Sequence, residues 1–265
     1  MIDVLEPLER QLWEARRAGF AAGEFVGQQS FVSVSELRWL ASCARVAAGS
    51  RVLDVCCGLA GPGLWLTSEY GCDYLGIDAD AEAIATARRR AVVAEVRAEF
   101  EVHRVLPIPL GEFDVVLLLE TLLAFRDKEA LMSQIAAALR PGGRVALTVE
   151  AGAPLTPAER AAMPGADTVW PTTLAALRAD FGWAGLRVVD SRDCTAAHAR
   201  VAESIADAYA SRAPALDPLL GAPLRRDLIT GHRLWATWLR SGRMRKFAVV
   251  AQRNTPRGSR SAGPL

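Results

Sequence analysis

Residues 52–63 read VLDVCCGLAGPG, and this stretch decides the fold class. Its first four residues are typical of a buried strand, its middle residues are small, and Pro62 stands where a helix can begin. Small side chains let a ligand approach backbone N–H groups, and the N-terminus of a helix attracts a carboxylate or a phosphate. The stretch therefore predicts a strand, a tight turn and a helix that together bind a nucleotide-type ligand.

Around this turn, short apolar runs alternate with segments of helical periodicity. The runs are continuously apolar, which is typical of strands covered by helices on both faces. They are RVLDV (51–55), DYLGID (73–78), EFEVHRV (99–105), FDVVLLL (113–119), RVALTVE (144–150), GLRVVD (185–190) and RKFAVVAQ (245–252). The pattern predicts an α/β fold with a parallel, doubly wound sheet.

Helices are expected on both sides of this core. Ser33 and Glu36 have the spacing of a capping box that opens a helix before the first strand. Residues 195–242 are helical in pattern and too long for a simple connection, which predicts a cap over the ligand edge of the sheet. The predicted parts are N-terminal helices or a lid (1–48), a cofactor-binding core (49–194), a helical cap over an acceptor pocket (195–242), the final core strand (243–252) and a disordered tail (253–265).

Composition limits the partners and the location. Lys and Arg number 31 against 30 Asp and Glu, so the net charge is +1 and creates no long-range field for nucleic acid or an anionic membrane. The N-terminus does not resemble a signal peptide, and no apolar run is long enough to cross a bilayer. Five cysteines without a CxxC pair indicate reduced thiols, and the three histidines lack metal-ligand spacing. We expect a cytoplasmic protein with a small-molecule partner, no metal, and neither nucleic acid nor membrane as partner; a homodimer is left open.

Four sequence blocks, in order along the chain, resemble one family over about residues 50–150. VLDVCCGLAG resembles motif I, and YLGIDAD resembles the acidic loop, of class I S-adenosylmethionine-dependent methyltransferases of the small-molecule type. LPIPLGEFDVV resembles the run before strand four of that family, and ALRPGGRVAL resembles its turn before strand five. The run RKFAVVAQ resembles the antiparallel seventh strand of that family. The resemblance implies a Rossmann-like seven-stranded sheet with an antiparallel last strand. It also implies S-adenosyl-L-methionine as cofactor and methyl transfer, by in-line displacement, to O, N or C of a small molecule in specialised metabolism.

The resemblance also implies which residues hold the cofactor. Two departures matter: Cys56 stands where the family usually has Gly, and Val102 stands where it often has an Asp that contacts adenine. His103 or Arg104 beside Val102 could take over that contact. The segment FVGQQS (25–30) has amides suited to folding over a cofactor, although a surface turn is an equal alternative. The expected cofactor residues are Gln29, Cys56, Gly58, Leu59, Asp78, Ala79, His103, Arg104 and Leu119.

Acceptor and catalytic residues are expected at the carboxyl ends of the strands and on the cap. Glu120 and Glu150 follow predicted strands, and each could be a base, an anchor for an amine, or a solvated carboxylate. Histidine is suited to proton removal near neutral pH, which makes His198 and His232 candidates beside Glu120 for catalysis. Trp170, Tyr209 and Trp235 could line an apolar acceptor pocket together with Glu150, but aromatic residues at helical spacing are more often plain core.

Three other functions remain open. A NAD(P)-dependent oxidoreductase would use a similar strand and turn, but its G-x-G-x-x-G fingerprint needs Gly in place of Cys56. The same fold and cofactor site could serve a decarboxylation or a cyclisation, because fold does not determine chemistry. A cofactor-binding scaffold without catalysis is the third alternative.

Overall fold

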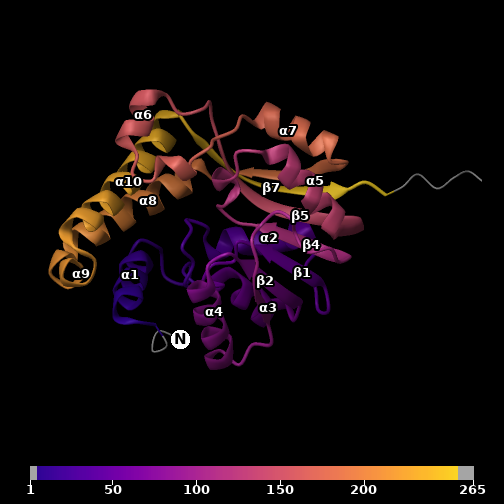
Figure 1. Ribbon diagram of the computed structural model, residues 1–265, viewed down its shortest axis with the longest axis horizontal. Coiled ribbons are helices and arrows are strands. Elements are labelled where there is room, and N and C mark those ends of the chain that lie inside the picture. Colours follow the sequence, from indigo (N-terminus) through magenta and orange to yellow (C-terminus); the bar gives the residue numbers. More distant parts are fainter. Residues whose placement is uncertain (1–4, 256–265) are drawn as a thin grey trace, which may run out of the picture.

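The computed structural model describes residues 5–255, and its centre is a seven-stranded sheet in the order β3-β2-β1-β4-β5-β7-β6. The strands are β1 (Arg51–Val55), β2 (Asp73–Asp78), β3 (Glu99–Val102), β4 (Phe113–Leu118), β5 (Leu139–Ala151), β6 (Leu186–Asp193) and β7 (Arg245–Arg253). From β3 to β5 all neighbours are parallel, whereas β7 is antiparallel to both β5 and β6. The predicted Rossmann-like sheet with an antiparallel last strand is confirmed (Figure 1).

Helices cover both faces of this sheet. Val52 and Leu53 are adjacent in β1 and both fully buried, one in the core cluster shared with α2, α3 and α4 and the other in the cluster shared with α5 and α7. This explains why the strand sequences are continuously apolar. The helices are α1 (Pro7–Ala18), α2 (Val34–Ala44), α3 (Gly61–Tyr70), α4 (Ala81–Val93), α5 (Lys128–Ala138), α6 (Pro157–Ala162), α7 (Leu174–Trp183), α8 (Thr195–Ser211), α9 (Ala213–Leu220) and α10 (Ala222–Ser241), with short 3-10 turns at Leu122–Ala124 and Ala166–Thr168.

Three helices between β6 and β7 form a separate group at one end of the sheet. Helices α8 and α10 pack along each other, and α1 from the N-terminal segment packs against α8 and α9 (Figure 1). The N-terminal helices and the 195–241 helices therefore meet, although most of the chain separates them in sequence. No helix within residues 5–255 is long and apolar enough to span a membrane.

Several predicted boundaries differ from the structure. Strand β3 ends at Val102, because the His103 N–H bonds to the carbonyl of Asp78 and the chain then leaves the sheet. Strand β5 begins at Leu139, so the Pro-Gly-Gly sequence that was expected as a turn lies inside the strand. The predicted tail falls mostly outside the described residues, which end at 255.

The capping box predicted for α2 is only half formed. The Ser33 hydroxyl accepts the N–H of Glu36, as expected, at 3.2 Å. The Glu36 carboxylate does not reach back to the cap; it points into the protein and contacts His198. A residue interpreted as a local helix signal is therefore part of a tertiary contact.

Candidate functional site

A pocket of about 170 Å³ lies where the β1–α3 turn meets the end of β4 and an N-terminal segment. We call it the central pocket. Its lining includes six of the predicted site residues: Gln29, Cys56, Gly58, Leu59, Leu119 and Glu120. The other lining residues belong to the turn and the 25–30 segment singled out in the sequence, except Thr121; they are Gly27, Gln28, Ser30, Asp54, Cys57, Ala60, Gly61, Pro62 and Thr121. Much of the predicted cofactor turn thus borders one cavity.

The β1–α3 turn is built from left-handed backbone conformations. Cys56, Gly58 and Ala60 have φ values of 62°, 53° and 54°. Such angles are easy for glycine and unfavourable for other residues, so the turn stores strain at Cys56 and Ala60. These angles let the chain reverse direction sharply between β1 and α3. The turn ends at the N-terminus of α3, where the first N–H groups lack partners within the helix. Cys56 therefore takes a glycine-like conformation in spite of its side chain.

Residues 24–32, which we call the strap, cross over this turn. The buried Arg90 side chain of α4 donates hydrogen bonds to the carbonyls of Val26 and Leu59, at 3.1 and 2.5 Å, and so ties the strap to the turn. The buried Gln28 amide donates to the carbonyl of Val32 at 2.6 Å and holds the strap's own shape. Of the two alternatives for this segment, the structure favours a cover over the pocket rather than a surface turn.

Asp78 stands at the end of β2, next to the turn but not in the lining of the central pocket. Its carboxylate accepts the N–H groups of Gly58 and Asp80, at 2.8 and 3.0 Å. One carboxylate thus holds the first and second strand ends together. Ala79 and Arg104 are exposed beyond it, and the His103 ring nitrogen lies 2.6 Å from the carbonyl of Pro107 in its own loop.

Five charged residues, four of them buried and Glu120 12% exposed, form a chain behind the central pocket. Glu120, with φ of 56°, is the member that lines the pocket. Its Oε1 lies 3.0 Å from both His198 Nδ1 and Lys246 Nζ. Beyond these cations lie two more carboxylates: His198 Nε2 is 2.6 Å from Glu36 Oε2, and Lys246 pairs with Glu150. We call Glu36, His198, Glu120, Lys246 and Glu150 the charge chain.

The charge chain determines protonation states at the site. Burial lowers the pKa of His198, but the nearby Glu120 and Glu36 carboxylates outweigh that effect and raise the pKa to about 9. Burial opposes ionisation of Glu120, yet Lys246 and His198 hold its pKa well below the ordinary range. For His232, burial and the Arg16 charge lower the pKa to about 4. These pKa shifts favour an ionised Glu120, a protonated His198 and a neutral His232 at neutral pH.

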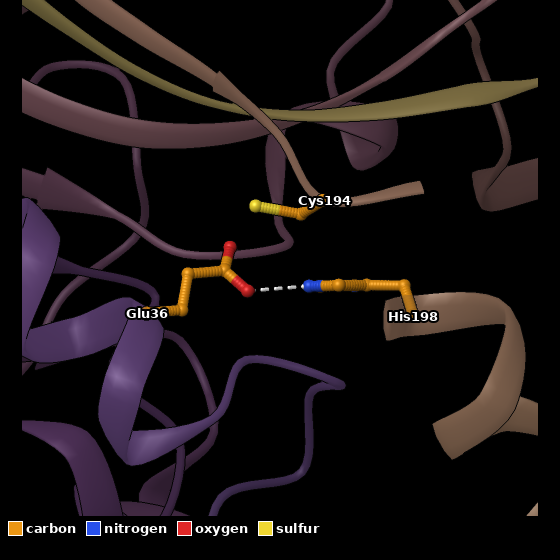
Figure 2. A group of neighbouring side chains, drawn as sticks. All are labelled: Glu36, Cys194 and His198. Carbon is orange, nitrogen blue, oxygen red and sulfur yellow. Dashed lines mark hydrogen bonds and ion pairs between the residues drawn. The ribbon is translucent and has the colours of Figure 1, made fainter. Parts of the chain in front are cut away.

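Glu36, Cys194 and His198 place possible metal-binding atoms within 4.8 Å of one another. Figure 2 shows the Glu36 carboxylate and the His198 ring facing each other directly, with Cys194 to one side. Two ligands of one zinc ion lie roughly 3 Å or more apart, farther than the 2.6 Å between Glu36 and His198. Burial also raises the pKa of the Cys194 thiol to about 12, whereas a metal would need the thiolate. The arrangement favours a hydrogen-bonded ion pair over a metal centre.

None of the predicted acceptor residues lines the central pocket. Trp170 lies between the guanidinium groups of Arg126 and Arg160, whose Cζ atoms are 5.1 and 4.4 Å from its ring centre. Tyr209 and Trp235 belong to packed apolar clusters, and Tyr209 is 1% exposed. Tyr209 is therefore a packing residue, whereas Trp170 and Trp235 are half-buried, and Trp170 lines a separate pocket with Arg126 and Arg160. Glu150 is buried against Lys246.

Two hydroxyl groups at the pocket were missed by the sequence analysis. The buried Ser30 Oγ and Thr121 Oγ1 have no hydrogen-bond partner among the described residues, and both residues line the central pocket. Buried hydroxyls are normally hydrogen-bonded, so such atoms indicate a place for a ligand's polar groups. The only sequence signal was their position, one residue after Gln29 and one after Glu120.

Known proteins are similar to this chain both in the sequence of the cofactor-binding core and in the fold. A family model described as a methyltransferase domain matches residues 52–143. Phosphoethanolamine N-methyltransferase 1 of Triticum aestivum is 32% identical over 141 residues, which cover 52% of this chain and 26% of that protein. The 27-O-demethylrifamycin SV methyltransferase of Amycolatopsis mediterranei is 37% identical over 112 residues, 41% of each chain.

The fold likeness extends farther than the sequence match. The cyclopropane synthase MmaA2 of Mycobacterium tuberculosis superposes with a TM-score of 0.79 over 95% of both chains, at 12% identity. At that identity the likeness concerns the fold alone. This chain spans between 26% and 30% of the length of the first three curated relatives it matches.

Proposed function

We propose that this chain, which belongs to the class I S-adenosylmethionine-dependent methyltransferases through its domain at residues 52–143, binds S-adenosyl-L-methionine at the central pocket and methylates a small molecule. The observation that carries the proposal is the pocket itself. A strained glycine-like turn, a covering strap and two unpartnered hydroxyls surround it, and an ionised carboxylate lies at one side. This donor set suits a cofactor that carries hydroxyls, a carboxylate and positive charge.

The cofactor would lie along the ends of β1, β2 and β4. The free N–H groups at the start of α3 and the Ser30 and Thr121 hydroxyls would bind its amino-acid part. Asp78 would accept ribose hydroxyls with the acceptor capacity left beside its two backbone bonds. His103 and Arg104 remain the predicted adenine contacts.

When bound, the cofactor supplies an activated methyl group on a sulfonium. The acceptor atom forms a bond to the methyl carbon while the sulfur–carbon bond breaks, so the protein mainly aligns the two and excludes water. The strap, which lines the pocket, would supply part of that enclosure, and α8–α10 are the proposed cover on the acceptor side. An acceptor that carries a proton must lose it, and the neutral His232 suits this task better than the protonated His198.

The acceptor class is a proposal drawn from the relatives' names. One is named for phosphoethanolamine and another for a rifamycin, and both are small molecules. We propose an acceptor from specialised metabolism, methylated on O, N or C. Cytoplasmic location, a homodimer, and neither nucleic acid nor membrane as partner stay predictions from composition.

The test is transfer of label from methyl-labelled S-adenosylmethionine to components of a metabolite extract. A labelled small molecule supports methyl transfer. Consumption of a metabolite without labelled product indicates the decarboxylation or cyclisation alternative, and cofactor binding without any turnover indicates a scaffold. Calorimetric titration with S-adenosylmethionine and NADH completes the experiment, because binding of NADH alone would refute the proposal.

A further inference from the structure

The charge chain contains one more carboxylate than it has cations. Glu36, Glu120 and Glu150 form ion pairs with His198 and Lys246, and all five side chains are between 1% and 12% exposed. The buried Lys128 adds an electrostatic attraction to Glu150 alone, at the far end of the chain from Glu36. Burying charge is costly unless each charge is matched. The excess negative charge therefore needs either a bound proton or a positive ligand. Glu120 is the member that reaches the central pocket.

The Glu120 carboxylate is held from three sides. The Phe31 N–H of the strap donates to Oε2 at 2.8 Å. His198 of α8 and Lys246 of β7 both contact Oε1 at 3.0 Å. The Glu120 N–H in turn donates to the Thr148 hydroxyl at 2.7 Å, which fixes the left-handed backbone that directs the side chain.

Glu36 acts at a distance from the pocket. It contacts the opposite ring nitrogen of His198, so both imidazole nitrogens face carboxylates. An imidazole in that position is stabilised with a proton on each nitrogen. Its Nδ1 atom then lies 3.0 Å from Glu120 Oε1, close enough for charge attraction although the pair lacks hydrogen-bond geometry.

We propose that Glu36, His198 and Lys246 are positioning residues that keep Glu120 ionised and aimed into the central pocket, where it binds the positive charge of S-adenosylmethionine instead of accepting a proton. The identity of the ligand rests on the proposed function; the arrangement of charges does not. The ionisable groups that face Glu120 are His198 and Lys246, with His232 of α10 farther away, while Glu36 and Glu150 face its two partners.

The first experiment needs no ligand. The chain has 3 histidines, so ring signals of a histidine-labelled sample can be assigned by single substitutions and followed by NMR against pH. His198 should remain protonated through neutral pH and lose its proton near pH 9. In Glu36→Gln the midpoint should move down toward the ordinary histidine value of about 6.5.

Glu24→Gln is the matched control, because Glu24 also bonds to α2 through Ser35 but does not contact His198. It should leave the His198 titration unchanged. A wild-type His198 that titrates near 6.5, or a midpoint that Glu36→Gln does not move, would overturn the proposal. Stoichiometric metal in the purified protein that disappears in Cys194→Ser would overturn it as well.

The second experiment measures binding of S-adenosylmethionine from about pH 5 to about pH 9. Glu120→Gln should weaken binding about tenfold at every pH, since a hydrogen bond or ion pair to a charged group is lost. Lys246→Met should weaken binding only toward acid pH, where Glu120 now takes up a proton, and Lys246→Met/Glu120→Gln should lose that dependence. Arg240→Met is the control, because Arg240 is an exposed cation that pairs with Glu203 and contacts no member of the charge chain.

The two experiments separate two kinds of failure. If the wild-type protein does not bind S-adenosylmethionine, the proposed function fails, and the NMR titration still tests the charge chain. If it binds and Glu120→Gln retains full affinity, the role of Glu120 is wrong while the proposed function stands.

Discussion

Asp78 shows how one side chain serves the fold and the ligand together. Its carboxylate holds the Gly58 and Asp80 N–H groups, which fixes the turn between two strand ends. A carboxylate has about four acceptor positions, so it can bind ribose hydroxyls without releasing those bonds. The same residue therefore positions the turn and contributes to affinity.

Asp78→Ala should weaken S-adenosylmethionine binding by about 1–3 kcal/mol, because ribose hydroxyls and two backbone donors lose their acceptor. Isothermal titration measures the change. Asp73→Asn, at the exposed start of the same strand, is the control and should bind as wild type. Equal affinity of Asp78→Ala and wild type would exclude the assignment.

Ser30→Ala should separate binding from stability. The Ser30 hydroxyl is buried without a partner, so its removal should not lower the melting temperature of the ligand-free protein. The same change should weaken S-adenosylmethionine binding severalfold, which corresponds to about 1 kcal/mol of binding free energy, if the hydroxyl contacts the ligand. Ser33→Ala is the comparison variant: it removes the N-cap of α2 and should lower the free energy of unfolding by about 1 kcal/mol. A destabilised Ser30→Ala protein with unchanged affinity would contradict the assignment.

At the scale of elements, the strap and the start of α3 are in close contact. A Cβ atom on Gly61 would lie 2.6 Å from the Val26 carbonyl oxygen and 2.7 Å from that of Gly27. Such distances are well inside van der Waals contact, so either the strap or the helix would have to shift. The cover over the pocket depends on this approach as well as on Arg90.

Gly61→Ala should displace the strap. We expect faster proteolysis within residues 24–32 and weaker cofactor binding, by roughly tenfold, while the sheet stays folded. Gly182→Ala is the control, because a Cβ at that helical position meets no atom within 4 Å. Protease resistance of Gly61→Ala equal to that of wild type would show that the strap does not depend on this contact.

At the scale of the whole molecule, the charge chain joins the N-terminal helices, the sheet and α8. Its contribution to stability depends on pH with a definite sign. The folded-state pKa of His198, about 9, lies above its unfolded value near 6.5. The proton is thus bound more tightly in the folded protein, and the stabilisation is complete below about pH 6.5 and lost as pH rises through about 9.

The free energy of unfolding should accordingly fall by up to about 3 kcal/mol between pH 6.5 and pH 9.5. Denaturant titrations at several pH values measure it. Glu36→Gln should move the loss to lower pH, and His103→Asn should retain the wild-type profile. Stability that rises over this interval would refute the assignment of a protonated His198.

Local sequence patterns predicted most of the fold. Continuous apolar runs predicted the strands, and the small-residue turn with Pro62 predicted the ligand-binding loop, because both depend on neighbours in sequence. The strap residue Gln29 and the strand-end residue Glu120 were also placed near the pocket. The roles of the aromatic residues of the cap could not be predicted in this way, because a core side chain and a side chain that lines a pocket have the same helical spacing.

By itself the sequence determined the order of strands and helices, the turn after β1 and the carboxylates at strand ends, since these follow from the periodicity and chemistry of consecutive residues. Only the tertiary structure decided that Glu36 turns away from its helix cap to meet His198, 162 positions away, and that Lys246 lies between Glu120 and Glu150. Such pairings arise because burial forces every charge to find a partner, and the partner depends on which elements pack together.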